Sequence, residues 1–373
     1  MKKSLNYKNI IFILGFFCLT CIGCITMKRP PETQLETWWK LYKKNYILPD
    51  GRVQRPEHGL DTVSEGQAYA MLFSVFLNDK ETFDLIFGWT EEHLSRSNKQ
   101  GDRLLAWHWK DGGVNDWMAA SDADCDYAFA LLLASNRWRE NTYREKAELV
   151  INDILKFETA RGADNRLFLL PGLWGNEKDG YLIQNPSYYS PAAFRLFFEI
   201  TQDRRWLDLT ETGYWILHHS GVRLGNVSGC GLIPDWCIVD FQGNILAMEG
   251  KSNDYGWEAV RIPMRVGLDL LWNKSEEGNK VLEKVYHVLQ ESNSDVGEVK
   301  AVYRYTGESA IEYGSLPSAA MAFFSAQALN TKADRLEVSF RNRLGEKSLI
   351  LNYYGQSLAF FPLAFESGIL KRP

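Results

Sequence analysis

The sequence predicts an all-α fold in which an inner and an outer ring of helices form a toroid within a single domain. Three observations support this prediction. Apolar residues recur at three-and-four spacing in about a dozen segments, which is the period of a helix with a buried face. Alternation of Val, Ile and Thr, the pattern of half-buried strands, is scarce. No Ser/Gly-rich linker or block of like charge divides the 373 residues.

Residues 1–24 are predicted to be a signal peptide. Three lysines precede or open an apolar stretch that runs from Ile10 to Cys24, and this order is typical of secretory signals. The stretch is shorter than the ~20 apolar residues that a spanning helix needs. We therefore expect the domain that follows, residues 34–373, to be exported.

The end of the apolar stretch resembles a bacterial lipobox, because the small residue Gly23 precedes Cys24. Cys21 stands where Leu is preferred in that motif. We interpret Cys24 as a lipidated residue that anchors the protein at the membrane surface. Ordinary signal-peptide cleavage and an uncleaved anchor are the alternatives. Residues 25–33 contain two adjacent prolines, which exclude a helix, and are expected to form a short tether.

The domain repeats one theme, an apolar helix followed by a loop that contains Gly, Pro, Asn or Asp. The first helix is predicted after Thr33, and a turn follows it at Asp50 and Gly51. Segments 167–170 and 233–241 are expected to be short strands or extended loops. Further helices are predicted at 65–78, 80–95, 122–136, 141–159, 189–201, 203–219, 257–272, 276–292, 315–328, 331–345 and 353–368.

Composition and motifs exclude several classes of protein. The net charge is -5 and no basic run occurs, so a nucleic-acid groove has no support. No Gly-rich loop follows a strand and no Gly-x-Ser-x-Gly motif appears. No Cys or His cluster has zinc spacing, and we predict neither a metal nor a cofactor. The 13 Trp residues fit either a large core or a cleft whose rings stack on sugars.

The cysteines outside the leader give little information about function. Cys125 is expected to be a buried free thiol in the middle of a helix. Cys230 and Cys237 are close enough in sequence to form a disulfide in an oxidising compartment. Spacing alone leaves that pairing open.

Three acidic motifs stand where apolar helices are predicted to begin. They contain Glu65, Asp122 and Glu258, each beside Gly, Ser or aromatic residues. Carboxylates brought together among aromatic rings can hydrolyse glycosidic bonds, because one acid protonates the glycosidic oxygen and a second carboxylate activates water. A general acid must be screened from water, so we expect Glu65 to face apolar rings such as Trp107, Trp109 or Tyr69.

Each motif also has a purely structural explanation. Ser64 and Gln67 would form a capping box at the start of one helix. Ser121 would cap the next helix, where first-turn acids are expected in any protein. Helix-cap carboxylates are common, so the first motif alone is weak evidence for catalysis.

The acids of the second and third motifs differ in the direction they face. Asp122 and Asp126 share one face of a helix, whereas Asp124 points elsewhere and is expected to brace a loop. Glu258 and Arg261 also share a face, and the simple explanation for them is a surface ion pair of little energetic value.

Four motifs stand out together in the sequence, and they are residues 63–69 with Glu65, residues 106–109 with Trp107, residues 120–132 with Asp122, and residues 185–191 with Tyr188. Together they resemble glycoside hydrolase family 8, and they occur in that family's order. The resemblance covers nearly all of the chain after about Trp38.

The resemblance implies an (α/α)6 barrel that cleaves a β-1,4-linked polysaccharide, such as cellulose, mixed glucan, xylan or chitosan, with inversion of the anomeric carbon. Glu65 matches the proton donor. Asp122 matches the acid beside the distorted sugar, where it helps to place water. Trp107 matches a sugar-stacking ring, and Arg261 matches the arginine of the third motif.

The third motif departs from the family pattern. Glu258 stands where much of the family has an Asp base, which adds one methylene to its reach. An inverting pair requires ~6.5–9.5 Å between carboxyl groups to admit water, and Glu258 meets this after a small backbone shift or in another rotamer. Asp254 is the reserve candidate for the base, followed by Asp116. Tyr188, Trp257 and Arg261 are predicted as further substrate contacts.

We therefore expect an exported, monomeric, lipid-anchored endo-glycosidase that acts on a cellulose-like glucan or a secreted exopolysaccharide and binds no nucleic acid. A xylan- or chitosan-specific hydrolase is one alternative. Another is a glycan-binding or exopolysaccharide-assembly protein that has lost its chemistry on the same scaffold. The negative net charge disfavours a lyase that acts on a polyanion.

Overall fold

The computed structural model describes residues 33–175, 180–296, 298–346 and 352–372. The folded unit is Gln34–Pro373. The predicted signal peptide, Cys24 and the tether up to residue 32 lie outside the described residues.

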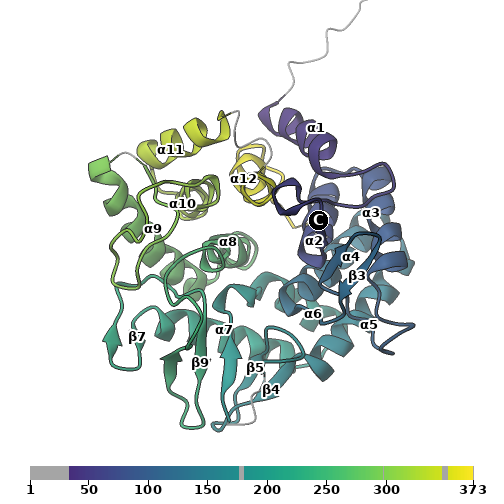
Figure 1. Cartoon of the computed structure of the whole chain (residues 1–373), viewed down its shortest axis with the longest axis horizontal. Coiled ribbons are helices and arrows are strands. Elements are labelled where there is room, and N and C mark those ends of the chain that lie inside the picture. The colour runs from purple at the N-terminus through teal and green to yellow at the C-terminus, as the bar shows by residue number, and fades with distance from the viewer. Residues whose placement is uncertain (1–32, 176–179, 297, 347–351, 373) are drawn as a thin grey trace, which may run out of the picture. The chain divides into compact units, whose positions relative to one another are not determined.

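Twelve α-helices lie within the described part of the chain, and they alternate between two rings (Figure 1). Each even-numbered helix contacts the next even-numbered one, and each odd-numbered helix packs against the outside of an even-numbered neighbour. The predicted all-α toroid is confirmed. The helices are α1 (Gln34–Tyr46), α2 (Ser64–Phe76), α3 (Lys80–His93), α4 (Ser121–Trp138), α5 (Asn141–Phe157), α6 (Pro191–Thr201), α7 (Arg205–Ser220), α8 (Ile262–Asn273), α9 (Glu276–Val296), α10 (Leu316–Ala328), α11 (Asp334–Leu344) and α12 (Tyr353–Glu366).

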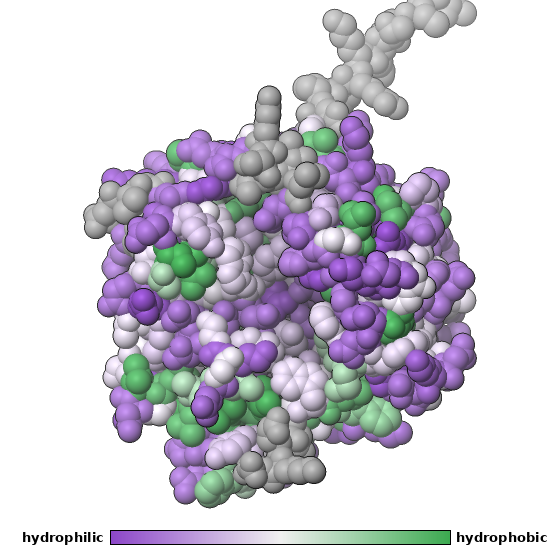
Figure 2. Space-filling model, viewed as in Figure 1, coloured by the Kyte–Doolittle hydropathy of each residue, from purple (hydrophilic) through white to green (hydrophobic). Residues whose placement is uncertain are grey.

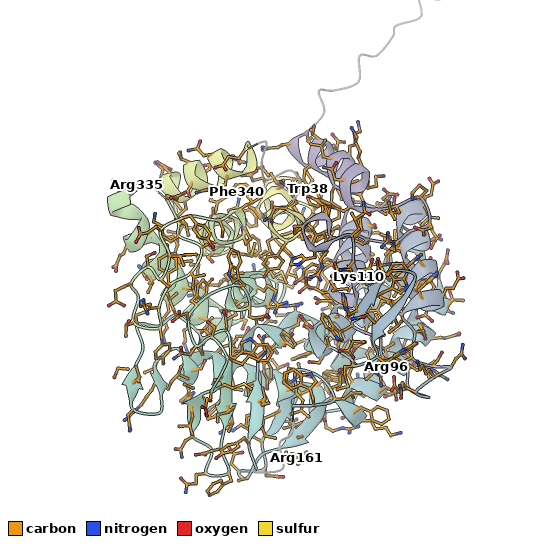
Figure 3. The ribbon with its side chains drawn as sticks, viewed as in Figure 1. Trp38, Arg96, Lys110, Arg161, Arg335 and Phe340 are labelled. Atoms are coloured by element: carbon orange, nitrogen blue, oxygen red, sulfur yellow. The ribbon has the colours of Figure 1, made fainter. Side chains whose placement is uncertain are left out.

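Aromatic rings close the inner ring where its two ends meet. Phe73 of α2 stacks on Phe360 of α12 with ring centroids 4.3 Å apart. Trp38 of α1, labelled in Figure 3, packs edge-on against Phe73 at 5.6 Å and contacts Phe360 at 5.5 Å. Because burial of such rings is worth more than their area alone, this cluster joins the first and last helices of the unit.

The two rings differ in sequence because they differ in exposure. All residues of the inner helix α2 are buried except Glu65. Small residues allow the inner helices to approach closely, since a Cβ on Gly267 would lie 2.6 Å from the Phe324 ring. The outer helix α5 buries one stripe at helical spacing, namely Tyr143, Ala147, Val150, Ile151, Ile154 and Leu155.

Short strands and 3-10 turns lie in the connections that lead into the inner helices. The expected strands near 167–170 and 233–241 are present as β5 and β9. Sheets form in the orders β1-β2-β3, β10-β9-β6, β4-β5 and β7-β8. The elements are η1 (Pro56–His58), β1 (Thr62–Val63), β2 (His108–Lys110), β3 (Gly113–Asp116), β4 (Thr159–Arg161), β5 (Leu167–Leu169), β6 (Leu182–Gln184), η2 (Pro186–Tyr188), β7 (Arg223–Leu224), β8 (Val227–Ser228), β9 (Cys237–Val239), β10 (Ile245–Ala247) and η3 (Ala259–Arg261).

The predicted capping box of α2 is wrong. Val63 occupies the N-cap position and no side chain caps the helix. Gln67 is instead fully buried, where its Oε1 accepts a hydrogen bond from Val53 N at 2.5 Å and its Nε2 donates to Thr90 Oγ1 at 2.8 Å. Pairing of β1 with β2 already fixes the entry of the chain, so Gln67 is free to hold a loop.

The structure also answers the expectations about Ser121, about the helix at 257–272 and about the cysteines. Ser121 is the first residue of α4 rather than its cap, and its hydroxyl donates to Leu170 O at 2.6 Å. The helix predicted at 257–272 begins later, because the turn η3 precedes α8. Cys230 and Cys237 are free thiols, and Cys125 is a buried free thiol as expected.

Candidate active site

The three acidic motifs meet at the rim of the toroid where the inner helices begin. Glu65 lies in the first turn of α2 and Asp122 in the first turn of α4. Glu258 directly precedes η3, the turn that leads into α8. Figure 2 shows one face of the molecule, which is hollowed near its centre and has hydrophilic side chains in the hollow.

One guanidinium group binds all three carboxylates. Arg261 Nη1 contacts Glu65 Oε2 at 2.5 Å and Asp122 Oδ2 at 3.0 Å. Arg261 Nη2 forms a close ion pair with Glu258 Oε2 and donates to Ser187 Oγ at 3.1 Å. Residues separated by up to 196 positions therefore form a single cluster, which we call the Arg261 cluster.

The members of the Arg261 cluster differ in their access to solvent. The exposed fraction of the side chain is 32% for Glu258 and 18% for Glu65, but only 4% for Asp122 and for Arg261. Glu65 and Glu258 each use one carboxylate oxygen in this cluster, and their Oε1 atoms make no hydrogen bond with other described residues. Two oxygens thus remain available to a ligand.

Charge and burial oppose one another within the cluster. Burial raises the pKa of Asp122 to about 7; the Arg261 guanidinium counteracts this and the Glu65 carboxylate adds to it. Burial would lower the pKa of Arg261, but the surrounding anions, Glu258 foremost, hold it well above its ordinary value. Three carboxylates around one fixed cation can therefore hold a proton near neutral pH.

A buried aspartate fixes the backbone that carries Glu258. Asp235 Oδ1 accepts hydrogen bonds from the backbone N–H groups of Gly256 at 3.0 Å, Glu258 at 3.0 Å and Ala259 at 2.8 Å. A Cβ on Gly256 would lie 2.6 Å from Asp235 Oδ2, so only glycine fits there. The side chain of Glu258 is held from another direction, because Asn185 Nδ2 donates to its Oε2 at 3.0 Å.

A second layer of charge lies one helical turn deeper. Arg265 Nη1 forms a close ion pair with Asp126, and both side chains are at most 5% exposed. Asp124 braces the loop before β2, as predicted, because its Oδ1 accepts from Leu105 N at 2.8 Å. Burial raises the pKa of Asp124, and the pKa of the fully buried Glu158 as well.

Aromatic side chains surround the rim. The Arg261 guanidinium lies over the Tyr188 ring at 5.2 Å, and Tyr188 contacts Trp236 at 6.2 Å. Trp107 is 36% exposed, and its Nε1 donates to Asp116 Oδ2 at 2.7 Å. Trp257 is 45% exposed. These rings offer flat apolar faces, which suit the faces of sugar rings.

The expectation about the rings that Glu65 faces is partly corrected. Tyr69 lies one turn along α2 and is fully buried; burial and the Glu65 carboxylate raise its pKa. Tyr353 of α12 is also buried, and burial and the Glu65 carboxylate raise its pKa. Trp109 instead contacts Arg52, whose guanidinium lies 4.7 Å from the ring centroid.

The two reserve bases lie outside the Arg261 cluster. Asp254 makes no ion pair with Arg261, and its backbone oxygen accepts from Asp235 N at 2.8 Å. Asp116 is bound by Trp107 and by Met118 N at 2.9 Å, and the Trp107 hydrogen bond lowers its pKa. Among described residues, no group of His, Cys, Asp and Glu could hold a metal ion.

Sequence reasoning missed two residues that hold the site together. Asp235 was assigned only to a possible strand, because a lone Asp in an apolar segment carries no catalytic pattern. Asn185 belongs to the motif of residues 185–191, but the sequence predicts no separate role for it. The combination of Asp235 with a glycine 21 residues later acquires meaning only through the fold.

The cluster provides the groups that glycoside hydrolysis requires. It offers two solvent-reaching carboxylates, Glu65 and Glu258, together with the buried carboxylate of Asp122 and aromatic rings at the rim. One such carboxyl group can donate a proton and the other can activate water. The cation Arg261 fixes their positions without itself transferring a proton.

The sequence matches the model of "Glycosyl hydrolases family 8" over residues 16–368. Endoglucanase A of Acetivibrio thermocellus is 28% identical over 363 residues, which is 91% of this chain and 70% of that protein. A probable endoglucanase of Novacetimonas hansenii is 30% identical over 239 residues, which is 63% of this chain and 67% of that protein.

The fold has solved counterparts. The structure of the endo-1,4-D-glucanase from Vibrio fischeri ES114 superimposes with a TM-score of 0.78 and 25% identity. The alignment covers 89% of this chain and 94% of that one. The structure of the endo-beta-1,4-glucanase CMCax from Acetobacter xylinum gives a TM-score of 0.74 at 23% identity, over 90% of this chain and 98% of that one.

Proposed function

The chain belongs to glycosyl hydrolases family 8, and from this premise we propose that it hydrolyses a β-1,4-linked glucan with inversion at the anomeric carbon. The observation that carries the proposal is the meeting of Glu65, Asp122 and Glu258 on the Arg261 guanidinium. The relatives named as endoglucanases favour a glucan over xylan or chitosan.

Glu65 protonates the glycosidic oxygen in this mechanism. It is the less exposed of the two solvent-reaching carboxylates, and its Oε1 is available to the substrate. Glu258 acts as the base, because its Oε1 is available to a water molecule while Asn185 and Arg261 hold its Oε2. Asp122 holds the sugar at the cleavage point and helps to place the water.

Aromatic rings bind the glucan on either side of the cleavage point. Trp107, Tyr188 and Trp257 supply apolar faces along the rim. Such faces can bind any sugar unit of a repeating chain, which suits internal cleavage of a polymer.

The cellular setting proposed here rests on the sequence alone. A signal peptide over residues 1–24 and lipidation at Cys24 would place the monomeric enzyme at the outer surface of a membrane. In the part of the chain that the structure describes, no helix has the length and apolarity that a membrane span needs. A tethered hydrolase would meet a glucan that the cell itself secretes. Labelling with radioactive palmitate, with Cys24→Ser as the control, tests the anchor.

Product analysis tests the reaction. The purified protein is incubated with carboxymethylcellulose, mixed-linkage glucan, xylan, chitosan and cellohexaose, and new reducing ends are followed. Proton NMR during the first minutes of cellohexaose cleavage is expected to show the α-anomer. Release from xylan or chitosan alone would reject the glucan, and an initial β-anomer would reject inversion.

Two variants separate the candidate bases. Glu258→Gln is expected to lower kcat by roughly 10²-fold, in the range that general base catalysis contributes. Asp254→Asn is expected to leave kcat within about twofold, since Asp254 is not part of the Arg261 cluster. The reverse pattern would transfer the role of the base to Asp254.

A further inference from the structure

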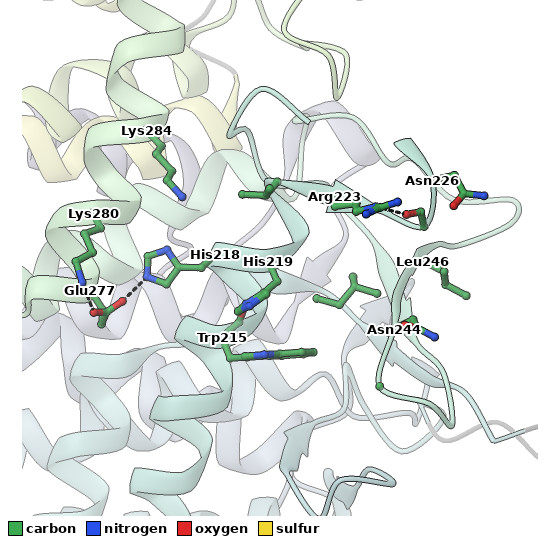
Figure 4. A pocket seen from close by; sticks show the side chains of 14 residues that line it. Trp215, His218, His219, Arg223, Asn226, Asn244, Leu246, Glu277, Lys280 and Lys284 are labelled. Atoms are coloured by element: carbon green, nitrogen blue, oxygen red, sulfur yellow. Dashed lines mark hydrogen bonds and ion pairs between the residues drawn. The ribbon is translucent and has the colours of Figure 1, made fainter. Parts of the chain in front are cut away.

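A groove of about 1090 Å³ lies on the outer wall of the folded unit, away from the Arg261 cluster. Its lining comes from α7, α9 and the β7–β8 and β9–β10 hairpins, and includes no residue of that cluster. Figure 4 shows Lys280 and Lys284 of α9 on one side of the groove. Arg223, Asn226 and Leu246 lie on the other side. The mechanism proposed above gives this volume no role.

The groove is basic although the chain as a whole is acidic. Its charged lining residues are Arg223, Lys280, Lys284 and Glu277, whereas the chain carries a net charge of -5. Glu277 is already bound, because its Oε1 accepts from Lys280 at 2.7 Å and its Oε2 lies 2.5 Å from His218 Nε2. Lys280 and Glu277 therefore compensate each other.

Two cations remain for a ligand. Lys284 is exposed and has no acidic partner among the described residues, and its side chain reaches into the groove (Figure 4). Arg223 uses only Nε, which donates to Gly225 O at 2.7 Å. Its two terminal amino groups make no hydrogen bond with described residues. A guanidinium with a free pair of N–H donors is suited to a carboxylate.

The same groove offers apolar and amide surface. Trp215 lies at its base and is half-buried. The Arg166 guanidinium covers the Trp215 ring at 4.4 Å, Phe168 packs edge-on at 6.2 Å, and the His219 ring lies tilted at 5.0 Å. The Trp215 ring is thus held in one orientation, and the part of it that lines the groove is what a ligand can contact. Asn226 has an amide without a hydrogen-bond partner among described residues. Such rings and amides bind the faces and hydroxyl groups of sugars.

We propose that this groove is a second, non-catalytic saccharide site that takes an acidic glycan, several linked sugars that carry carboxylate groups. Arg223 and Lys284 bind carboxylates, and Trp215 and Asn226 contact the sugar rings. Typical ligand pockets span ~300–1,000 Å³, so the groove has room for more than one sugar. The proposal does not depend on the catalytic roles assigned above.

Calorimetric titration of the full-length protein tests the site. The probes are a tetramer of β-1,4-linked glucuronic acid, neutral cellotetraose and inorganic pyrophosphate. The acidic tetramer is expected to bind, and Lys284→Glu is expected to weaken its binding by about tenfold or more, which equals ~1.4 kcal/mol. Cellotetraose binding is expected to be the same in both proteins.

A matched variant controls for the change in net charge. Lys332→Glu reverses the same charge at a position that is 86% exposed and outside the groove, and should leave the affinity for the acidic tetramer unchanged. Equal affinity in Lys284→Glu and wild type would overturn the proposal. Pyrophosphate that binds as tightly as the tetramer would also overturn it, because the groove would then recognise charge without sugar.

Hydrolysis provides a second readout that separates this proposal from the catalytic one. Lys284→Glu is expected to lower activity on carboxymethylcellulose relative to neutral mixed-linkage glucan by about threefold or more. An unchanged ratio would contradict the proposal, because the groove would then not bind the carboxylate-bearing polymer. If Glu65→Gln kept full activity, the catalytic proposal would fail while the binding result would stand.

Discussion

Arg261 is the last residue of η3 and Arg265 lies four residues later in α8, and both bind carboxylates from α4. Arg261 meets three carboxylates, of which two reach solvent. Arg265 meets one carboxylate, Asp126, and the pair is sealed in the core. The same residue types therefore form a centre with excess negative charge at the rim and a balanced ion pair below it. The excess charge marks the layer in which a proton can be exchanged.

The largest expected effect separates the two layers by activity. Glu65→Gln should lower kcat by ~10²–10⁴-fold, the contribution of a general acid. Its melting temperature should not fall, because removal of one of three anions relieves repulsion around Arg261. The measurement is kcat on cellohexaose together with a thermal melt. Activity within a few fold of wild type would remove Glu65 from the mechanism.

Breaking the deeper pair should affect stability instead. Asp126→Asn leaves the Arg265 guanidinium buried without a partner charge, and such losses cost ~3–5 kcal/mol. Arg265 already has Nε and Nη2 unpaired, so after the change only the charge interaction with Asp122 still stabilises the buried guanidinium. Chemical denaturation measures the change in the free energy of unfolding. Asp164→Asn, which breaks an exposed pair with Arg166, should cost less than ~1 kcal/mol and serves as the control.

Asp235 offers a finer test, because it acts on Glu258 through the backbone. Burial raises the pKa of Asp235 to about 6, and its ionised form is the better acceptor for three N–H groups. Asp235→Asn should lower kcat by roughly tenfold with little change in KM, since a charged hydrogen bond is worth ~1.5–3 kcal/mol. Asp240→Asn changes an exposed acceptor of the β9–β10 hairpin and should change neither value. A loss that appears in KM rather than in kcat would contradict this positioning role.

The last prediction concerns the dependence of stability on pH. Burial raises the pKa of Asp122 from 3.8 to about 7, so protonation stabilises the folded state. That contribution is fully present below the ordinary pKa and is lost as pH rises through the folded-state pKa. The free energy of unfolding should therefore decrease between about pH 5 and about pH 8, and should decrease less in Asp122→Asn. Identical pH slopes would show that Asp122 stays ionised throughout this range.

The fold was largely predictable because its elements follow local rules. All twelve helices lie within a few residues of the predicted ranges, since an apolar stripe of helical period is a strong local pattern. The helix starts were less predictable. Ser64 and Gln67 satisfy the local requirements of a capping box. The Gln67 amide instead forms tertiary hydrogen bonds with Val53 and Thr90.

The charged residues of the candidate site were predictable from the sequence, but the residues that hold them in position were not. Glu65, Asp122, Glu258 and Arg261 were all identified from motifs, and the structure brings them together. Asp235 was missed because its role depends on a backbone that approaches it from positions 256–259. No pattern within a short window of sequence records such an approach.

The sequence by itself determined which segments become helices and which carboxylates stand at their starts, because both depend on neighbours a few positions away. Only the tertiary structure decided that one guanidinium, that of Arg261, binds side chains spread over nearly 200 positions, namely Glu65, Asp122, Ser187 and Glu258. The tertiary structure also decided that Arg223 and Lys284 face one groove. The physical reason is that charge interactions depend on separation in space, which ring closure of the helices sets.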